Sequence, residues 1–254
     1  MRYKNTLLTG HSGTLGQAIL ASGAFSGLLS PSRDSLDITK PETIRQFFKG
    51  HDIDAVIHCA ALARMAECES EPRKAIQANM SGTCNLVMES MIKEKELGES
   101  IRFVYISTDG VYPGIRGNYT EHDETIPYNK YGWTKLGAEG AVNLLDNFCI
   151  IRTSFFDPNN IPFDASATDA YSSKVTTTYL VKAIGTMLNS DFIGTINIGG
   201  SKKSDYDRYK EFKPQLKPCK LDDIMIDLPF KLANNASLNS SLWEQIEKKE
   251  RGSR

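Results

Sequence analysis

Cysteine is scarce in this 254-residue sequence, and its placement argues against a disulfide or metal framework. The five cysteines are odd in number, widely scattered and never in C-x-x-C spacing. This pattern favours free thiols in a reducing compartment over disulfides or a metal site. The four histidines cluster with no other metal-binding residues, and we therefore expect no bound metal.

The sequence also lacks long hydrophobic runs and an excess of charge of either sign. No apolar stretch approaches the roughly 20 residues that a membrane span requires, and the first residues lead into a predicted strand without a signal-peptide pattern. The formal net charge of −1 argues against a nucleic-acid-binding surface. These absences predict a soluble cytoplasmic protein with no membrane or nucleic-acid partner. With 40% apolar residues, the chain is long enough to form one sizeable core.

Three glycines follow the first predicted strand, which begins at Thr6, and a helix-forming segment comes next. A strand, a tight turn and a helix in this order bring bare backbone N–H groups and the positive end of a helix dipole to a pyrophosphate. Gly10 would permit the turn, Gly13 the close approach of the phosphates, and Gly16 the packing of helix on strand. The motif predicts a dinucleotide site with these cofactor-binding residues: Gly10, Ser12, Gly13, Thr14, Leu15 and Gly16.

The second predicted strand, within residues 27–33, ends in hydroxyls and a cation instead of an acid. An Asp or Glu at this point suits the ribose 2′-hydroxyl of NAD, whereas an Arg with neighbouring hydroxyls suits the 2′-phosphate of NADP. Ser32 and Arg33 therefore favour NADP(H) as cofactor, with NAD(H) as the alternative. An ordinary solvated arginine is the other interpretation of Arg33.

Asp37 and Ile38 precede a predicted helix whose first turn contains Pro41, with Thr39 and Glu42 spaced as a capping box. The Asp37 carboxylate has two candidate roles. It would either accept hydrogen bonds within its own turn or accept one from the adenine amino group of the cofactor, and the sequence leaves both open.

Residues 54–61 and 102–109 form two nearly continuous apolar runs, typical of parallel strands buried on both faces. His58, inside the first run, is expected to be a hydrogen-bonded core residue. A long helix is predicted between the runs, from about residue 71 to residue 97. The first run ends in small residues that leave room for a cofactor: Cys59, Ala60 and Ala61. The second ends in Thr108 and Asp109, at the strand end where open α/β sheets place their chemistry.

Tyr131 and Lys135 are four residues apart on a helix predicted over residues 128–148, so they lie on one face of it. A phenol with a pKa of about 10 is a poor proton donor at neutral pH, and a nearby cation lowers that pKa. Lys135 is therefore predicted to tune Tyr131. The same spacing recurs at residues 206–210 and 209–213, but in a charged segment where solvated surface is expected.

Together these motifs resemble the extended short-chain dehydrogenase/reductases and, within them, the dTDP-4-dehydrorhamnose reductase family. The matching segments are residues 9–16, 36–39, 69–72, 107–109, 131–135 and 152–154, with weaker matches at 171–173, 194–200 and 236–239. The resemblance implies that NADPH delivers hydride to the 4-keto group of a nucleotide-linked 6-deoxysugar. In that reaction Tyr131 donates the proton, Lys135 also holds the nicotinamide ribose, and Thr108 bonds the reacting oxygen.

The resemblance also assigns residues to the substrate and to catalysis. The catalytic residues it implies are Thr108, Tyr131 and Lys135, of which Tyr131 and Lys135 also contact the cofactor. The substrate-binding residues it implies are Thr108, Asp109, Val111, Tyr131 and Ser154.

The implied architecture is α/β: a doubly wound, Rossmann-like parallel sheet of about seven strands with a small C-terminal substrate lobe. We expect an NADP-binding domain over residues 1–155 and the lobe over 156–254. A helix near 176–190 and a strand near 194–199 are expected to return to the first domain. The lobe is shorter than the family pattern, and residues 244–251 are expected to form a charged, solvated helix or tail.

The trimmed lobe keeps two other functions open. One is a nucleotide-sugar epimerase or epimerase/reductase that holds NAD tightly. The other is a non-catalytic, cofactor-binding regulatory subunit, resembling the regulatory beta subunit of methionine adenosyltransferase. Homodimers are common among similar proteins, although no amphipathic stretch in this sequence requires a partner.

Overall fold

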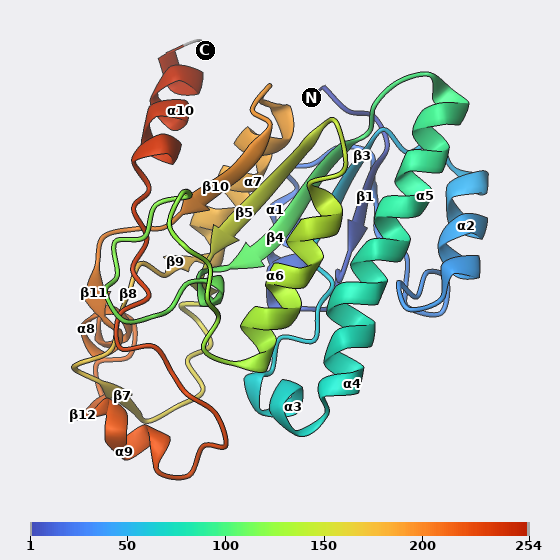
Figure 1. The fold of residues 1–254 in the computed structure, drawn as a ribbon. Helices are drawn as coiled ribbons and strands as arrows, with labels where there is room; N and C mark the ends of the chain where they lie inside the picture. Colours follow the sequence, from blue (N-terminus) through green and yellow to red (C-terminus); the bar gives the residue numbers. More distant parts are fainter. Residues whose placement is uncertain (1, 253–254) are drawn as a thin grey trace.

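The computed structural model describes residues 2–252 and places six parallel strands in one sheet, in the order β10-β5-β4-β3-β1-β2 (Figure 1). The predicted doubly wound α/β fold is confirmed, with six strands instead of about seven. The chain leaves this sheet after β5, because the next strand, β6 (Phe155–Phe156), pairs with β9 (Val175–Thr176) in a separate sheet. The six strands are β1 (Thr6–Thr9), β2 (Leu28–Leu29), β3 (Ala55–His58), β4 (Arg102–Thr108), β5 (Phe148–Thr153) and β10 (Gly194–Ile198).

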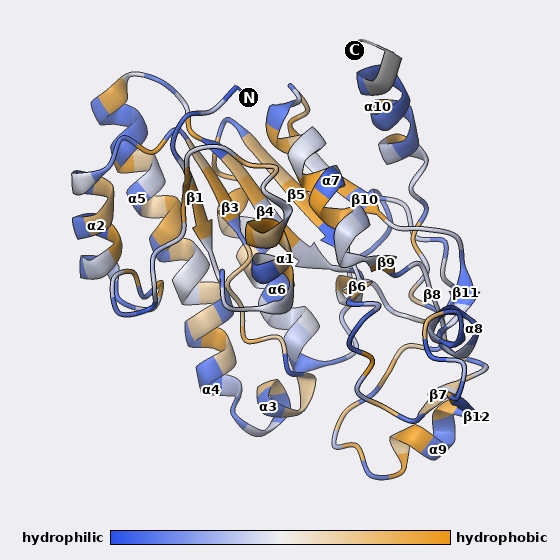
Figure 2. Cartoon of the chain, turned by 180° about the vertical axis from the view of Figure 1, so that it is seen from behind, coloured by the Kyte–Doolittle hydropathy of each residue, from blue (hydrophilic) through white to orange (hydrophobic). Residues whose placement is uncertain are grey.

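Side chains from successive strand positions enter two hydrophobic clusters, one on each face of the sheet. Leu8 and Val104 belong to one cluster, and their neighbours Leu7 and Phe103 belong to the other. Helices α1 (Thr14–Ser22) and α7 (Thr177–Asn189) cover the first face, and α2 (Pro41–Gly50), α5 (Gly82–Leu97) and α6 (Lys130–Val142) cover the second. The middle positions of the strands are consequently mostly apolar (Figure 2).

The single helix expected over residues 71–97 is divided in the structure. It consists of α4 (Pro72–Ala75), a π-helical turn (Ile76–Ser81) and α5, after a short α3 (Met65–Ser70). Asn79, within the π turn, points inward and accepts a hydrogen bond from the Leu62 N–H at 2.7 Å. Its amide nitrogen donates to Thr134 Oγ1 at 2.9 Å, which ties the turn to α6. Such turns are often found at functional sites.

The predicted capping box at the start of α2 does not form. The N-cap residue is Lys40, without a side-chain cap. The Thr39 hydroxyl instead donates to Asp37 Oδ1 at 2.7 Å, because the Asp37 side chain already turns back toward its own backbone.

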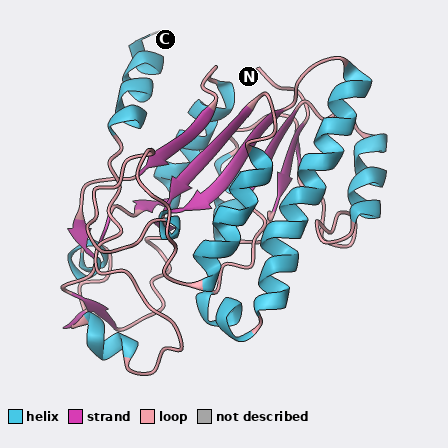
Figure 3. Cartoon of the chain, in the orientation of Figure 1, coloured by secondary structure: helices cyan, strands magenta, loops and turns pink. Residues whose placement is uncertain are grey.

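A small lobe lies apart from the main sheet, at the lower left of Figure 3. In it, β7 (Ala165–Ala167) pairs with β12 (Lys217–Cys219), and β8 (Tyr171–Ser172) pairs with β11 (Lys203–Ser204). Helices α8 (Asp205–Lys210) and α9 (Leu221–Met225) complete it. Between these segments, α7 packs against α1 and β10 joins β5 at the sheet edge.

The last helix, α10 (Ser241–Gly252), also returns to the main sheet and packs against β10 and α7. Trp243 is fully buried, and its indole N–H donates to the Tyr179 hydroxyl at 2.8 Å. The expected charged, solvated helix is consistent with residues 244–250, which are exposed or half-buried, whereas the buried aromatic side chain just before them, Trp243, anchors the start of the helix. No helix in residues 2–252 is long and apolar enough to cross a membrane.

Candidate active site

A cavity of about 300 Å³ opens at the carboxyl ends of β1 and β3, where the strand order reverses direction. In open α/β sheets this is where a dinucleotide binds. Gly10 has φ +74°, and a Cβ added to it would lie 2.5 Å from the backbone nitrogen of Ala60. A Cβ added to Gly16 would lie 2.3 Å from the Gly10 carbonyl oxygen. The turn therefore requires glycine at both positions.

Nine of the expected cofactor-binding residues line this cavity: Gly10, Ser12, Gly13, Arg33, Asp37, Ile38, Cys59, Ala60 and Ala61. Thr14, Leu15, Gly16, Ser32, Tyr131 and Lys135 do not line it. Thr14 begins α1, Leu15 is buried in the hydrophobic cluster below it, and Ser32 Oγ bonds Ser35 Oγ at 3.3 Å. The lining residues that the sequence analysis missed are neighbours of its motifs: Thr9, His11, Pro31, Leu36, Thr39, Leu62 and Ala78.

Arg33 and Asp37 form an ion pair at this cavity. Arg33 Nε donates to Asp37 Oδ2 at 3.2 Å, and the arginine side chain is otherwise exposed. Burial would raise the pKa of Asp37, but hydrogen bonds from Thr39 and Arg33 outweigh it and lower that pKa. Asp37 thus bonds within its turn and also faces the cavity, so the structure keeps both of its candidate roles.

Tyr131 is the second residue of α6, whose N-cap residue is Asn129. The Asn129 side chain accepts from the Gly132 N–H at 2.9 Å. A Cβ added to Gly132 would lie 2.3 Å from the Gly110 carbonyl oxygen, so only glycine permits this approach of α6 to the 3₁₀ turn Asp109–Val111. The sequence signal for this contact is a glycine inside a helix, where glycine carries an entropic cost.

Thr108 and Asp109 stand beside Tyr131 at the end of β4. Burial and the charge of Asp109 raise the pKa of Tyr131, while hydrogen bonding to Thr108 acts to lower it. The Thr108 hydroxyl donates to Asp109 Oδ1 at 3.2 Å and accepts from the Gly110 N–H at 3.1 Å. Burial raises the pKa of Asp109 to about 6.

This raised pKa predicts how stability depends on pH. Between the ordinary pKa of Asp, about 4, and about 6, the folded chain keeps a proton on Asp109 that the unfolded chain releases, so stability falls as pH rises. We therefore compare the free energy of unfolding of the wild type with that of Asp109→Asn. The difference, wild type minus variant, is expected to fall by about 2 to 3 kcal/mol between pH 4 and pH 7. Urea denaturation at both pH values measures it, with the exposed Asp34→Asn as control. A pH-independent difference between wild type and Asp109→Asn would contradict the assignment.

Lys135 is buried on the same helix, with its ammonium 4.1 Å from the centre of the Tyr105 ring. Burial lowers the pKa of Lys135 to about 7, against the charges of Cys59 and Glu139. Lys135 is not among the groups that shift the pKa of Tyr131, which burial and Asp109 raise. The expectation that Lys135 lowers the Tyr131 pKa is therefore not met in this structure.

His58 is a fully buried core residue. Its Nδ1 lies 2.6 Å from Thr9 Oγ1 and its Nε2 lies 2.9 Å from Thr83 Oγ1. Burial and the charge of Lys135 lower the pKa of His58 to about 3, so the imidazole is neutral at physiological pH. The two hydroxyl contacts join the end of β1, where the glycine turn begins, to α5.

A second cavity, of about 120 Å³, lies between the carboxyl end of the sheet and the small lobe. Asp109 and Ser154 line it, as expected for substrate-binding residues, whereas Thr108, Val111 and Tyr131 do not. Val111 is fully buried in a cluster with Tyr112, Tyr119 and Leu238, because the 3₁₀ turn directs it inward. The other polar residues of the cavity wall are Tyr128, Ser166, Tyr171, Ser172, Lys174 and Asp205, and the apolar ones include Ala167, Ala170, Leu221, Ile224 and Leu232.

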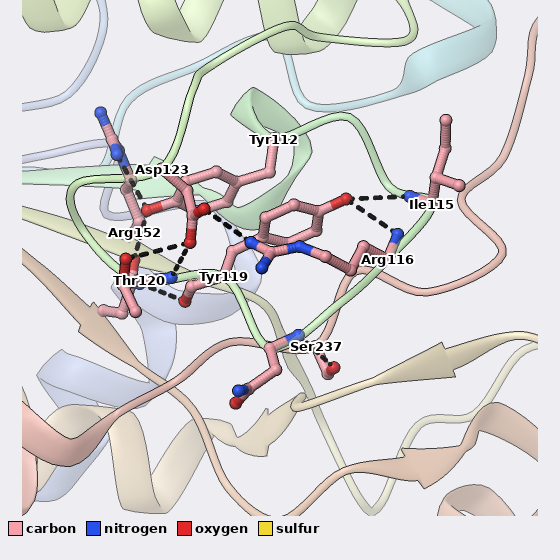
Figure 4. A network of polar contacts seen from close by, with 10 residues as sticks. Tyr112, Ile115, Arg116, Tyr119, Thr120, Asp123, Arg152 and Ser237 are labelled. Carbon is pink, nitrogen blue, oxygen red and sulfur yellow. Dashed lines mark hydrogen bonds and ion pairs between the residues drawn. The ribbon is translucent and has the colours of Figure 1, made fainter.

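The loop that follows the 3₁₀ turn is fastened to β5 through Arg152 (Figure 4). Arg152 Nη1 donates to the Tyr112 hydroxyl at 2.9 Å, and Tyr112 stacks on Tyr119 with ring centres 4.8 Å apart. The Tyr119 hydroxyl accepts from the backbone N–H groups of Ile115 and Arg116. These contacts hold the loop beside the end of β4.

The fold and the site together define an extended short-chain dehydrogenase/reductase. The cavity at the reversal of strand order is lined by glycines, and α6 carries Tyr131 and Lys135 four residues apart beside the end of β4. A small lobe lies across the strand ends. The chain belongs to the RmlD substrate binding domain family, whose pattern matches residues 4–160. The resemblance to dTDP-4-dehydrorhamnose reductases is thereby confirmed.

Two kinds of curated protein are among those similar to this chain. A dTDP-4-keto-6-deoxy-D-glucose reductase of Streptomyces niveus is 34% identical over 154 residues, which are 59% of this chain and 51% of that protein. The beta subunit of methionine adenosyltransferase 2 of Rattus norvegicus is 31% identical over 148 residues, 55% of this chain and 42% of that protein. The chain thus spans about half the length of the curated relatives it matches.

Among solved structures, the dTDP-4-dehydrorhamnose reductase of Bacillus anthracis in complex with NADP superposes with a TM-score of 0.84. The two chains are 20% identical, and the superposition covers 99% of each. At this identity the match shows a shared fold.

Proposed function

We propose that this chain is an NADP(H)-dependent reductase of a nucleotide-linked 4-keto-6-deoxysugar. The observation that carries the proposal is the close approach of the start of α6 to the 3₁₀ turn Asp109–Val111, which brings Tyr131 beside Thr108 and Asp109 at the end of β4. Asp109 lines the second cavity, and Lys135 is buried one turn further along the same helix; neither Tyr131 nor Lys135 lines either of the two cavities. This arrangement suits a reaction in which cofactor and carbonyl substrate meet at one helix.

The residues present fit a dinucleotide. The turn has no room for a side chain at Gly10 or Gly16, so the backbone N–H groups that border the cavity can approach phosphates closely. When bound, NADPH supplies the hydride for the carbonyl carbon. The Thr108 hydroxyl would bond the carbonyl oxygen, and the Tyr131 O–H would transfer its proton to that oxygen as negative charge develops on it. Lys135, a buried cation on the cofactor side, would hold the nicotinamide ribose.

A non-catalytic regulatory subunit is the second candidate, and the similarity to the methionine adenosyltransferase 2 beta subunit favours it. NADPH oxidation in the presence of dTDP-4-keto-6-deoxymannose separates the candidates. Turnover supports the reductase, and tight NADPH binding without turnover supports the regulatory subunit. NAD that copurifies with the protein would instead support an epimerase.

Arg33→Ala tests the choice of cofactor. We expect the Kd for NADPH to rise about 10-fold and the Kd for NADH to change less than about 3-fold, because only NADPH has a 2′-phosphate for the guanidinium to bind. Fluorescence titration with both cofactors measures the difference. Arg45→Ala is the matched control, since Arg45 pairs with Glu89 away from the cofactor cavity. An equal loss for both cofactors would remove the assignment of Arg33 to the 2′-phosphate.

A further inference from the structure

Lys174, the residue before β9, places a fixed cation in the wall of the second cavity. Its ammonium donates to Asp205 Oδ2 at 2.7 Å and lies 5.4 Å from the centre of the Tyr209 ring. Asp205 is itself held, because its Oδ1 accepts from the Ser172 hydroxyl at 2.8 Å. The Lys174 carbonyl accepts from Arg208 Nη1 at 2.7 Å. Both the backbone and the side chain of Lys174 are therefore in place before a ligand arrives.

The position of the Lys174–Asp205 pair indicates a role beyond stability. Burying an ion pair costs desolvation, and well-packed apolar residues often replace such pairs without loss of stability. Here each side chain keeps 21% of its surface exposed, and both residues line the cavity. An ammonium has three N–H donors. Asp205 takes one and the Tyr209 hydroxyl is within reach of a second, which leaves a donor for a ligand in the cavity.

Asp109 supplies the complementary acceptor in the same cavity. Its Oδ1 is bonded by Thr108, the residue that adjoins Tyr131, so its carboxylate lies next to the expected position of the reacting carbonyl. A hydroxyl group can donate one hydrogen bond and accept others. An ammonium and a carboxylate in one small cavity form a matched pair for such a group.

We propose that Lys174 and Asp109 together bind the hydroxyl on the sugar carbon next to the reacting carbonyl, and that Lys174 thereby selects sugars that carry this hydroxyl. The inference rests on the proposed function. Selection follows because a site built to bond a hydroxyl leaves its polar groups unpaired when an analogue lacks it. Asp205 positions Lys174 for this contact and need not contact the sugar.

The test compares a dTDP-4-keto-6-deoxyhexose with its 3-deoxy analogue in NADPH oxidation. For Lys174→Met we expect kcat/KM to fall about 10- to 100-fold on the hydroxylated sugar and to change less than about 3-fold on the 3-deoxy sugar. Asp205→Asn keeps the Lys174 ammonium but removes the carboxylate that holds it. This variant should lower kcat/KM on the hydroxylated sugar by a smaller factor than Lys174→Met. Lys203→Met is the matched control, because Lys203 pairs with Glu211 in the same lobe but does not line the cavity.

Equal losses on the two sugars would overturn the proposal, since they would indicate a structural role, and so would no loss on either. The Kd for NADPH should stay the same in all variants. If the wild type turns over neither sugar, the proposed function fails by itself. Calorimetry with the reduced dTDP-6-deoxyhexose and its 3-deoxy form then decides on binding alone: the wild type should bind the hydroxylated form at least about 10-fold tighter, and equal affinities would overturn the inference.

Discussion

Tyr131→Phe is expected to lower kcat for the proposed reduction by about 10²- to 10⁴-fold, the usual contribution of a positioned general acid. The substitution removes one oxygen and leaves the ring, so α6 should keep its packing against Gly110 and Thr108. The Kd for NADPH should therefore stay within about 2-fold of the wild type. Steady-state NADPH oxidation and a fluorescence titration measure the two quantities.

The chain contains a matched control for this variant. Tyr206 and Lys210 have the same spacing on α8, and the Lys210 ammonium donates to the Tyr206 hydroxyl. They are remote from the cofactor cavity, and Tyr206→Phe should leave kcat unchanged. If Tyr131→Phe were as active as the wild type, the proton would come from another group, and the assignment of Tyr131 as acid would be wrong.

Local patterns were enough to predict the sheet and the cofactor side of the site. A parallel strand buried on both faces forms a nearly continuous apolar run, so the runs ending at His58 and Thr108 identify β3 and β4 without tertiary information. The glycine turn is equally local, because Gly10 and Gly16 meet backbone atoms only a few residues away or on the adjacent strand. The glycine turn, the segment after β2 and the end of β3 therefore line the cofactor cavity as expected, whereas Tyr131 and Lys135 on α6 do not.

Contacts between distant segments could not be predicted in this way. Lys174 meets Asp205 across 31 residues, and Trp243 reaches Tyr179 across 64. Neither pair has a periodic pattern that reveals it. The Lys135 ammonium lies over the aromatic ring of Tyr105 in β4. The spacing of residues along α6 does not predict this contact, because Tyr105 is on another element. The lobe side of the site is thus visible only when the chain is folded.

The largest stability effect is expected at Glu139, one helical turn after Lys135 on α6. Its carboxylate is buried and accepts from Arg152 Nη2 at 2.7 Å and from Arg152 Nε at 3.1 Å. The Ser107 hydroxyl donates to the same carboxylate, so Glu139 joins α6 to both β4 and β5. Glu139→Ala leaves the Arg152 guanidinium buried with the Tyr112 hydroxyl as its remaining side-chain partner.

We expect Glu139→Ala to lower the free energy of unfolding by about 3 to 5 kcal/mol, because an uncompensated buried charge is costly. Arg152→Met alone should also destabilise the fold, but the double variant Glu139→Leu/Arg152→Met should recover most of the loss, since it removes both charges and fills their space. Urea denaturation of the wild type, Glu139→Leu, Arg152→Met and the double variant measures this cycle, and Glu139→Ala is measured beside it. Additive losses in the double variant would show that the two charges act independently. Recovery of stability without recovery of kcat would show that the pair's role is to hold α6, and with it Tyr131, against the end of β4.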